Sequence, residues 1–175
     1  MAKQLGLTMQ RQQHSNWCWA AVAASVAHFF DKSSQWTQCV LASQQLNQPN
    51  NGCCTNGDDP DTCNQVSHLE KSLSLIRHRN PDTDNPSDGI ASPEVIKQEI
   101  DLGRPIGVRI GWDDSLDQGH FILVTGYDDG TPDLTVMIND PENPDGSPPS
   151  KCPYSALEHG YLSESGVWKN TYFII

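Results

Sequence analysis

The 175-residue sequence has no apolar run of the roughly 18 residues that a membrane-spanning helix needs. The longest candidate, residues 20–30, is interrupted by Ser25 and His28. Basic side chains are also scarce: 11 Lys and Arg stand against 22 Asp and Glu, which gives a formal net charge of −11. Such a field repels phosphate backbones and anionic lipid surfaces. We therefore expect neither a nucleic acid nor a membrane as a partner.

Internal repeats and low-complexity tracts are lacking too, and the length is that of one ordinary domain. Hydrophobic residues make up 36% of the chain and charged residues 19%, which is typical of a globular protein rather than a disordered one. A chain of this length can bury a core that is large enough to hold the fold. We expect a single domain over residues 1–175.

The N-terminal residues 1–4 lack the apolar core of a secretory signal peptide. Four of the six cysteines, however, fall within 25 residues among turn-forming Asn, Gly, Asp and Pro; they are Cys39, Cys53, Cys54 and Cys63. This clustering is typical of a disulfide-stapled loop in an oxidising compartment. We expect two disulfides among these four, with the pairing open, Cys152 unpaired, and a secreted or extracellular protein whose leader was removed. A zinc site with His68 is the alternative, which the lack of CxxC pairs disfavours.

The hydrophobic pattern changes its period part-way along the chain. Apolar spacing and capping signals predict helices over residues 17–30, 37–46, 65–76 and 93–103. Beyond that point, alternating residues predict strands over 106–110, 121–127, 134–139 and 171–175. Helices followed by strands indicate an α+β fold with antiparallel pairing. We expect a helical lobe over about 12–103, a β lobe over about 104–175, and a site in the cleft between them.

Cys18 lies apart from the loop cysteines, between Trp17 and Trp19 at the start of the first predicted helix. Ser15 or Asn16 is the expected cap of this helix. A thiol in a first helical turn faces unpaired backbone N–H groups and the positive end of the helix dipole, and both favour the thiolate. Cys18 is therefore the candidate nucleophile. A buried core cysteine, the commoner fate of a free thiol, is the alternative.

Polar residues far from Cys18 in the sequence could complete a nucleophilic site. His120 opens an apolar strand after the small Gly119, which suits a side chain that points into a cleft. Asp140, at the end of the next strand, could hold one imidazole N–H and leave the other ring nitrogen to face the thiol. The neighbouring Asn139 could do the same, so the orienting residue is one of these two.

Gln12 lies six residues before Cys18. Its side-chain amide could donate a hydrogen bond to an oxyanion, together with the backbone N–H of Cys18. The surrounding stretch is rich in glutamine, and Gln13 is a competitor one residue away.

Four motifs in this order resemble those of papain-like cysteine peptidases (clan CA). They are Gln12, Cys18-Trp19-Ala20 opening a helix, Gly119-His120, and Asn139-Asp140-Pro141. The 102 residues from Cys18 to His120 are fewer than the roughly 130–150 of papain and the cathepsins. Asp140 also stands where papain has an asparagine. Both departures point to compact bacterial relatives, such as bacteriocin-leader-processing peptidases and the papain-fold effector proteases of plant pathogens.

The resemblance covers nearly the whole chain and implies a nucleophile helix packed on an antiparallel β lobe. It implies that Cys18 attacks a protein or peptide substrate, that His120 is the general base and acid, that Asp140 orients His120, and that Gln12 contributes to the oxyanion hole. It also implies a monomer without a metal or organic cofactor. Because a fold does not fix the acceptor of an acyl-enzyme, a thiol acyltransferase or deamidase is an alternative, and a non-catalytic papain-like binding module is another.

Overall fold

The computed structural model describes residues 1–83, 87–112, 119–142, 150–161 and 166–175. Its helices are α1 (Cys18–Phe30), α2 (Gln38–Gln45), the 3-10 helix η1 (Pro49–Cys54), α3 (Leu69–Leu75), α4 (Pro93–Asp101) and α5 (Tyr154–His159). Its strands are β1 (Ala2–Gln4), β2 (Ser87–Asp88), β3 (Ile106–Gly111), β4 (His120–Asp128), β5 (Thr135–Asn139), β6 (Ser150–Pro153) and β7 (Val167–Phe173). None of the described helices is long and apolar enough to cross a bilayer.

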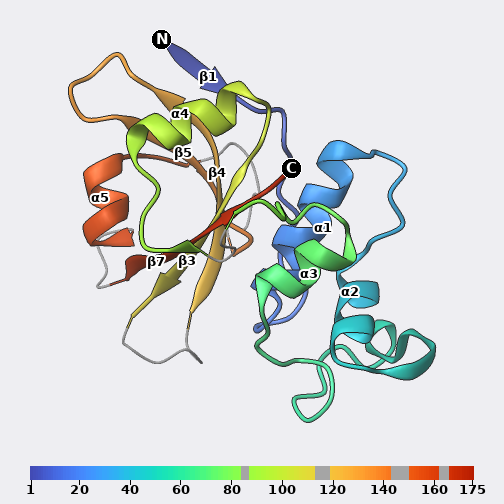
Figure 1. Ribbon diagram of the computed structural model, residues 1–175. Coiled ribbons are helices and arrows are strands. Elements are labelled where there is room, and N and C mark those ends of the chain that lie inside the picture. Colours follow the sequence, from blue (N-terminus) through green and yellow to red (C-terminus); the bar gives the residue numbers. More distant parts are fainter. Residues whose placement is uncertain (84–86, 113–118, 143–149, 162–165) are drawn as a thin grey trace.

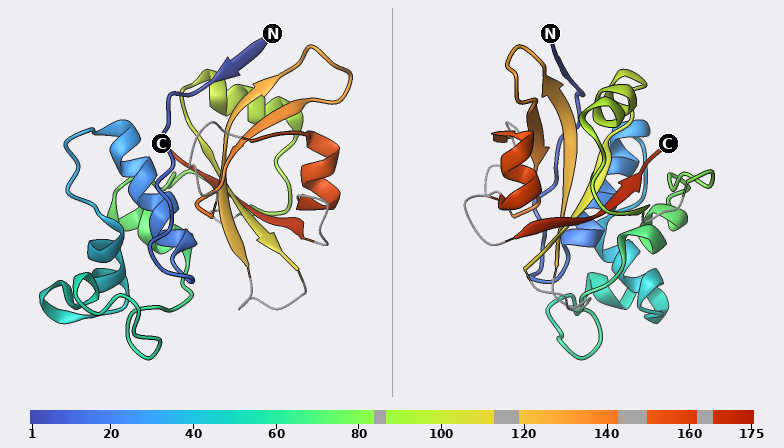
Figure 2. Two further views of the ribbon diagram at one scale, coloured as in Figure 1. Left: turned by 180° about the vertical axis from the view of Figure 1, so that it is seen from behind. Right: turned by 60° about the vertical axis from the view of Figure 1, so that its left-hand side comes forward.

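One antiparallel sheet organises the molecule. Its strands follow the order β2-β7-β3-β4-β5-β6, and β1 pairs with β4 beside this path. Helices α1, α2 and α3 gather on one side of the sheet, whereas α4 and α5 lie on the other side (Figures 1 and 2). Strands β3, β4 and β5 lie inside the sheet and are covered on both faces. Successive side chains of the alternating patterns that predicted them therefore point to opposite covered faces.

The two faces of β4 belong to two hydrophobic clusters. Phe121 and Leu123 pack with α1, α2 and α3, while Ile122 and Val124 pack with α4 and α5. Although α4 falls within the expected helical lobe of about 12–103, it packs against the far face of the sheet, where it contacts β1, β3 and β4. Helices α3 and α4 therefore lie on opposite faces of the sheet.

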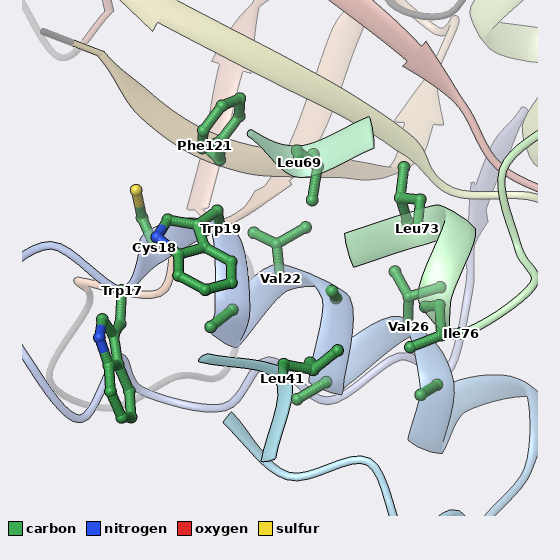
Figure 3. Packing of buried hydrophobic residues seen from close by; sticks show 14 of the residues in the cluster. Trp17, Cys18, Trp19, Val22, Val26, Leu41, Leu69, Leu73, Ile76 and Phe121 are labelled. Atoms are coloured by element: carbon green, nitrogen blue, oxygen red, sulfur yellow. The ribbon is translucent and has the colours of Figure 1, made fainter. Parts of the chain in front are cut away.

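Helix α1 is buried around its whole circumference from Cys18 to Ala27. The sequence explains this, because seven of the ten residues are alanine or valine and none is charged. Figure 3 shows Val22 and Val26 of α1 lying between Leu41 of α2 and the α3 residues Leu69 and Leu73. A helix fixed on all sides is a rigid support for the residue at its first position.

Several element boundaries differ from the sequence-based predictions. Helix α3 begins at Leu69 rather than at residue 65, so Val66 lies outside the helix and is largely exposed. The final strand spans Val167–Phe173 rather than 171–175. The short elements β1, β2, β6 and α5 were not predicted, because segments of two to six residues are too short to show a period.

Candidate active site

Cys18 is the first residue of α1, and its side chain is almost completely buried. Trp17 is the N-cap residue and makes no capping hydrogen bond with its side chain, so the expected capping by Ser15 or Asn16 is not observed. In Figure 3 the sulfur of Cys18 points toward Phe121 of β4 and away from Val26 and Leu41. The nucleophile candidate thus lies where the helix meets the edge of the sheet.

The segment before α1 is held by hydrogen bonds to residues 63–65, at the end of the loop that the disulfides close. Asn16 and Asn64 form a double contact, in which the Asn16 backbone N–H donates to Asn64 Oδ1 and Asn16 Nδ2 donates to the Asn64 carbonyl. Trp17 Nε1 donates to the Cys63 carbonyl at 2.8 Å, and Trp19 Nε1 donates to the carbonyl of residue 65 at 3.1 Å. These contacts fix both residues that flank Cys18.

Two disulfides close this loop, as the clustered cysteines predicted. They join Cys39 to Cys54 and Cys53 to Cys63. A close approach at Gly57 adds to them, because a Cβ there would lie 2.2 Å from Nε2 of His14. Only glycine lets the loop backbone rest against that imidazole. The remaining cysteines, Cys18 and Cys152, are free thiols.

Removing the Cys53–Cys63 disulfide by the double substitution Cys53→Ser and Cys63→Ser should lower the free energy of unfolding by about 2–4 kcal/mol. Activity should fall as well, because Cys63 carries the carbonyl that holds Trp17. The matched control replaces Cys39 and Cys54 with serine, which should cost similar stability and less activity. Urea denaturation and turnover of both variants check this. Equal losses of activity would contradict a role of Cys63 in fixing the Cys18 segment.

His120 opens β4, and its Nε2 lies 2.7 Å from Oδ1 of Asp140. Strand pairing explains this proximity. Leu123 is opposite Asn139, and continuing that register places Asp140 diagonally across from His120 on the same face. Because Nε2 is engaged with Asp140, Nδ1 is the ring nitrogen left for the hydrogen bond with Cys18. The imidazole thus stands between a carboxylate and a thiol.

The charges of the site favour a protonated imidazole. Burial alone would lower the pKa of His120, but the hydrogen bonds and charges of Asp140 and Cys18 outweigh it and raise the pKa to about 10. Burial alone would likewise raise the pKa of Asp140, but His120, the Tyr161 hydroxyl and the Glu142 N–H lower it below its usual range. An imidazolium paired with a carboxylate follows from both shifts.

Asn139, the alternative to Asp140, faces the other side of β5. Its Oδ1 accepts a hydrogen bond from the Thr125 hydroxyl at 2.5 Å, and its Nδ2 is buried without a partner among the described residues. Adjacent strand residues point to opposite faces, so only one of the pair can meet His120. In the structure that residue is Asp140.

Gln12 is anchored beside the end of β5, where its backbone N–H donates to the Pro141 carbonyl at 2.8 Å. Its amide nitrogen donates to the Ser15 carbonyl at 2.9 Å and, more weakly, to the His14 carbonyl at 3.3 Å. Its Oε1 is buried, with no partner in the described part of the chain. The amide nitrogen of Gln12 therefore makes one short hydrogen bond, to Ser15, and one longer hydrogen bond, to His14.

An open cleft of about 140 Å³ lies over these groups. Its walls come from the segment before α1, the residues before α3, and the ends of β3, β4 and β5. The lining residues are Ser15, Asn16, Cys18, Trp19, Val66, Ser67, Trp112, Gly119, His120, Phe121 and Glu142. Val66 and Trp112 line this cleft and are among the exposed large hydrophobic residues, so the cleft offers apolar surface as well as polar groups.

Gly119 has a packing role next to His120. A Cβ at this position would lie 2.8 Å from Nε of Arg109, which is nearly buried on the neighbouring strand β3. The missing side chain lets the guanidinium group of Arg109 pack against the backbone just before His120. The sequence connected Gly119 only with the direction of the His120 side chain, and the contact with Arg109 is what the structure adds.

Sequence reasoning missed Tyr161 and Glu142, which both contact Asp140. No motif marks them, and Tyr161 lies 21 residues away from Asp140 in the chain. Among the described residues, no group of three or more His, Cys, Asp and Glu side chains could hold a metal ion.

Comparisons with known proteins identify the family to which the chain belongs. The model of the Peptidase_C39-like family matches residues 4–171. The chain belongs to this family. It is thus a cysteine peptidase, a hydrolase that acts on proteins or peptides. No curated protein sequence matches the chain significantly.

Solved structures agree on the papain-like fold of this Peptidase_C39-like chain. The peptidase domain of Streptococcus ComA, a bi-functional ABC transporter involved in quorum sensing, is 15% identical with a TM-score of 0.54, over 95% of this chain and 96% of that one. A chain from a structural study of the mite allergens Blo t 1 and Der p 1 is 14% identical with a TM-score of 0.50, over 98% and 68% of the two chains. The predicted α+β papain-like fold is confirmed.

Proposed function

We propose that the protein is an endopeptidase in which Cys18 is the nucleophile, His120 the general base and acid, Asp140 the residue that orients His120, and Gln12 a donor of the oxyanion hole. The observation that carries this proposal is the position of His120, which is 2.7 Å from Asp140 and hydrogen-bonded to Cys18 at the floor of the cleft. The peptidase family supports the reaction type.

The reaction begins with a thiolate and an imidazolium. The Cys18 sulfur attacks the carbonyl carbon of the scissile bond and forms a C–S bond, while the carbonyl oxygen becomes an oxyanion. The Cys18 backbone N–H, which has no partner within the helix because it lies in the first turn of α1, and one amide hydrogen of Gln12 stabilise this oxyanion. His120 then protonates the leaving amine as the C–N bond breaks, which leaves a thioester.

The second half of the reaction restores the enzyme. Neutral His120 takes a proton from water, whose oxygen attacks the thioester carbon and releases the second product as a carboxylic acid. The proton on His120 and the Cys18 thiolate are then back in their starting state. The Asp140 carboxylate keeps Nε2 in place in both halves and stabilises the imidazolium.

The test uses a synthetic peptide library as the substrate and mass spectrometry as the readout. Cleaved peptides should appear with the wild-type protein and be absent with Cys18→Ala, because the thiol forms the C–S bond. A brief incubation followed by acid quenching should also show an acyl group on Cys18. A matched control, Cys152→Ala, removes the other free thiol, which lies on β6, and should cleave normally.

Two outcomes would overturn the proposal. Acyl-Cys18 that releases product only when an amine such as hydroxylamine is added would indicate an acyltransferase. A wild-type protein that neither cleaves the library nor reacts at Cys18 with iodoacetamide would indicate the non-catalytic binding module.

A further inference from the structure

Asp140 is held by more than His120. Its Oδ1 accepts from His120 Nε2 at 2.7 Å and from the Glu142 backbone N–H at 2.8 Å. Its Oδ2 accepts from the hydroxyl of Tyr161 at 2.6 Å. Each carboxylate oxygen therefore has a donor of its own, and the side chain of Asp140 is only 11% exposed.

Tyr161 reaches Asp140 from outside the cleft. It follows α5, its backbone N–H donates to the Gly166 carbonyl at 2.7 Å, and its ring is buried in the hydrophobic cluster on the far face of the sheet. It is not among the residues that line the cleft around Cys18. A substrate bound over Cys18 would thus meet His120 but not Tyr161.

We propose that Tyr161 is a positioning residue, whose hydroxyl fixes the Asp140 carboxylate so that Oδ1 stays directed at His120. This inference rests on the proposed function of the site. A carboxylate with one unpartnered oxygen could turn about its Cβ–Cγ bond and present Oδ2 or a bifurcated contact to the imidazole. With the Tyr161 hydroxyl on Oδ2, that rotation breaks a charge-assisted hydrogen bond.

The groups around the pair keep Tyr161 a donor. Burial, then the charge and hydrogen bond of Asp140, raise the pKa of Tyr161 far above its usual value, and Cys152 and Glu142 act in the same direction. Among the residues that the structure describes, the titratable side chains that interact with Asp140 are His120, with Cys18 beyond it, and Tyr161. Because the hydroxyl donates to the ionised carboxylate, its loss raises the pKa of Asp140, and the carboxylate takes up a proton at a higher pH.

The test is Tyr161→Phe, which removes one oxygen and keeps the ring. We expect kcat to fall about 10- to 100-fold with KM within about threefold, because the lost hydrogen bond is to a charged group and does not touch the substrate. The acid limb of kcat against pH should move to higher pH, and the alkaline limb should stay. The matched control is Tyr154→Phe, which removes the hydroxyl that donates to the Ala91 carbonyl from the same segment.

Thermal unfolding and iodoacetamide labelling of Cys18 accompany the kinetics. The inference is supported if Tyr161→Phe moves the acid limb and Tyr154→Phe does not, at comparable melting temperatures. It is overturned if both variants keep the wild-type limbs, even if both are destabilised, because the role of Tyr161 is then structural only. The proposed function survives that result, since wild-type cleavage and Cys18 labelling are unaffected. A wild-type protein without Cys18-dependent cleavage overturns both.

Discussion

Replacing His120 with alanine should lower kcat by about 10⁴-fold or more, one of the two largest effects expected in this protein. The imidazole performs three steps of the proposed reaction: it keeps the thiolate paired, protonates the leaving amine and activates water. Besides Cys18, the described titratable side chains that line the cleft are His120 and Glu142. Glu142 is an acid and cannot replace His120 as a cationic partner of the thiolate. Turnover of a cleavable library peptide measures this loss.

A chemical readout of the same variant needs no substrate. Iodoacetamide should modify Cys18 faster in the wild-type protein than in His120→Ala at every pH below about 8, because an imidazolium beside the sulfur favours the reactive thiolate. In His120→Ala the reaction should become fast only toward pH ~8.5, where an ordinary thiol ionises. The exposed His159 provides the control His159→Ala, which should behave as the wild type.

Cys152 is an internal standard for this labelling experiment. Burial, then the charge of Asp133, raise the pKa of its thiol to about 11, so it should react slowly in every variant. If Cys18 of the wild type reacted only near pH ~8.5 and as slowly as in His120→Ala, no thiolate–imidazolium pair would exist in this state.

The parts of the fold that could be predicted are those whose cause is local in the sequence. The alanine- and valine-rich segment of α1 and the alternating residues of β3 and β4 show their periods over at least six residues. Cys18 and His120 could be singled out because each stands at the start of such an element. Their order and spacing then matched one family.

The parts that could not be predicted depend on contacts between distant segments. Whether Asn139 or Asp140 meets His120 is decided by the pairing of β4 with β5, since a shift of one residue would exchange their faces. Tyr161 enters the site from just beyond α5, a helix of only six residues, on the opposite side of the sheet from α1. The pairing of Cys53 with Cys63 likewise depends on how the loop folds, which the spacing of the cysteines does not show.

Asp140→Asn is the other change with a very large expected effect, and its effect should depend on pH. The substitution keeps the shape and one acceptor oxygen, but it removes the negative charge. Burial, which alone lowers the pKa of His120, is then opposed only by Cys18, so the pKa should fall from about 10 toward or below the usual 6.5. The imidazolium is lost as pH rises through that lower value. At pH 8 we expect kcat/KM to fall by about 10²-fold or more, with a smaller loss near pH 5.5.

The pH profile of kcat/KM from pH 4 to 10 separates this effect from simple damage to the fold. A damaged site would reduce kcat/KM evenly at every pH, whereas loss of the charge should move the alkaline limb to lower pH by several units. The Tyr161 hydroxyl can accept as well as donate, so the new amide nitrogen has a partner at the position of Oδ2. An alkaline limb that stayed in place would contradict the assigned role of Asp140, since Cys18 alone would then be holding the proton on His120.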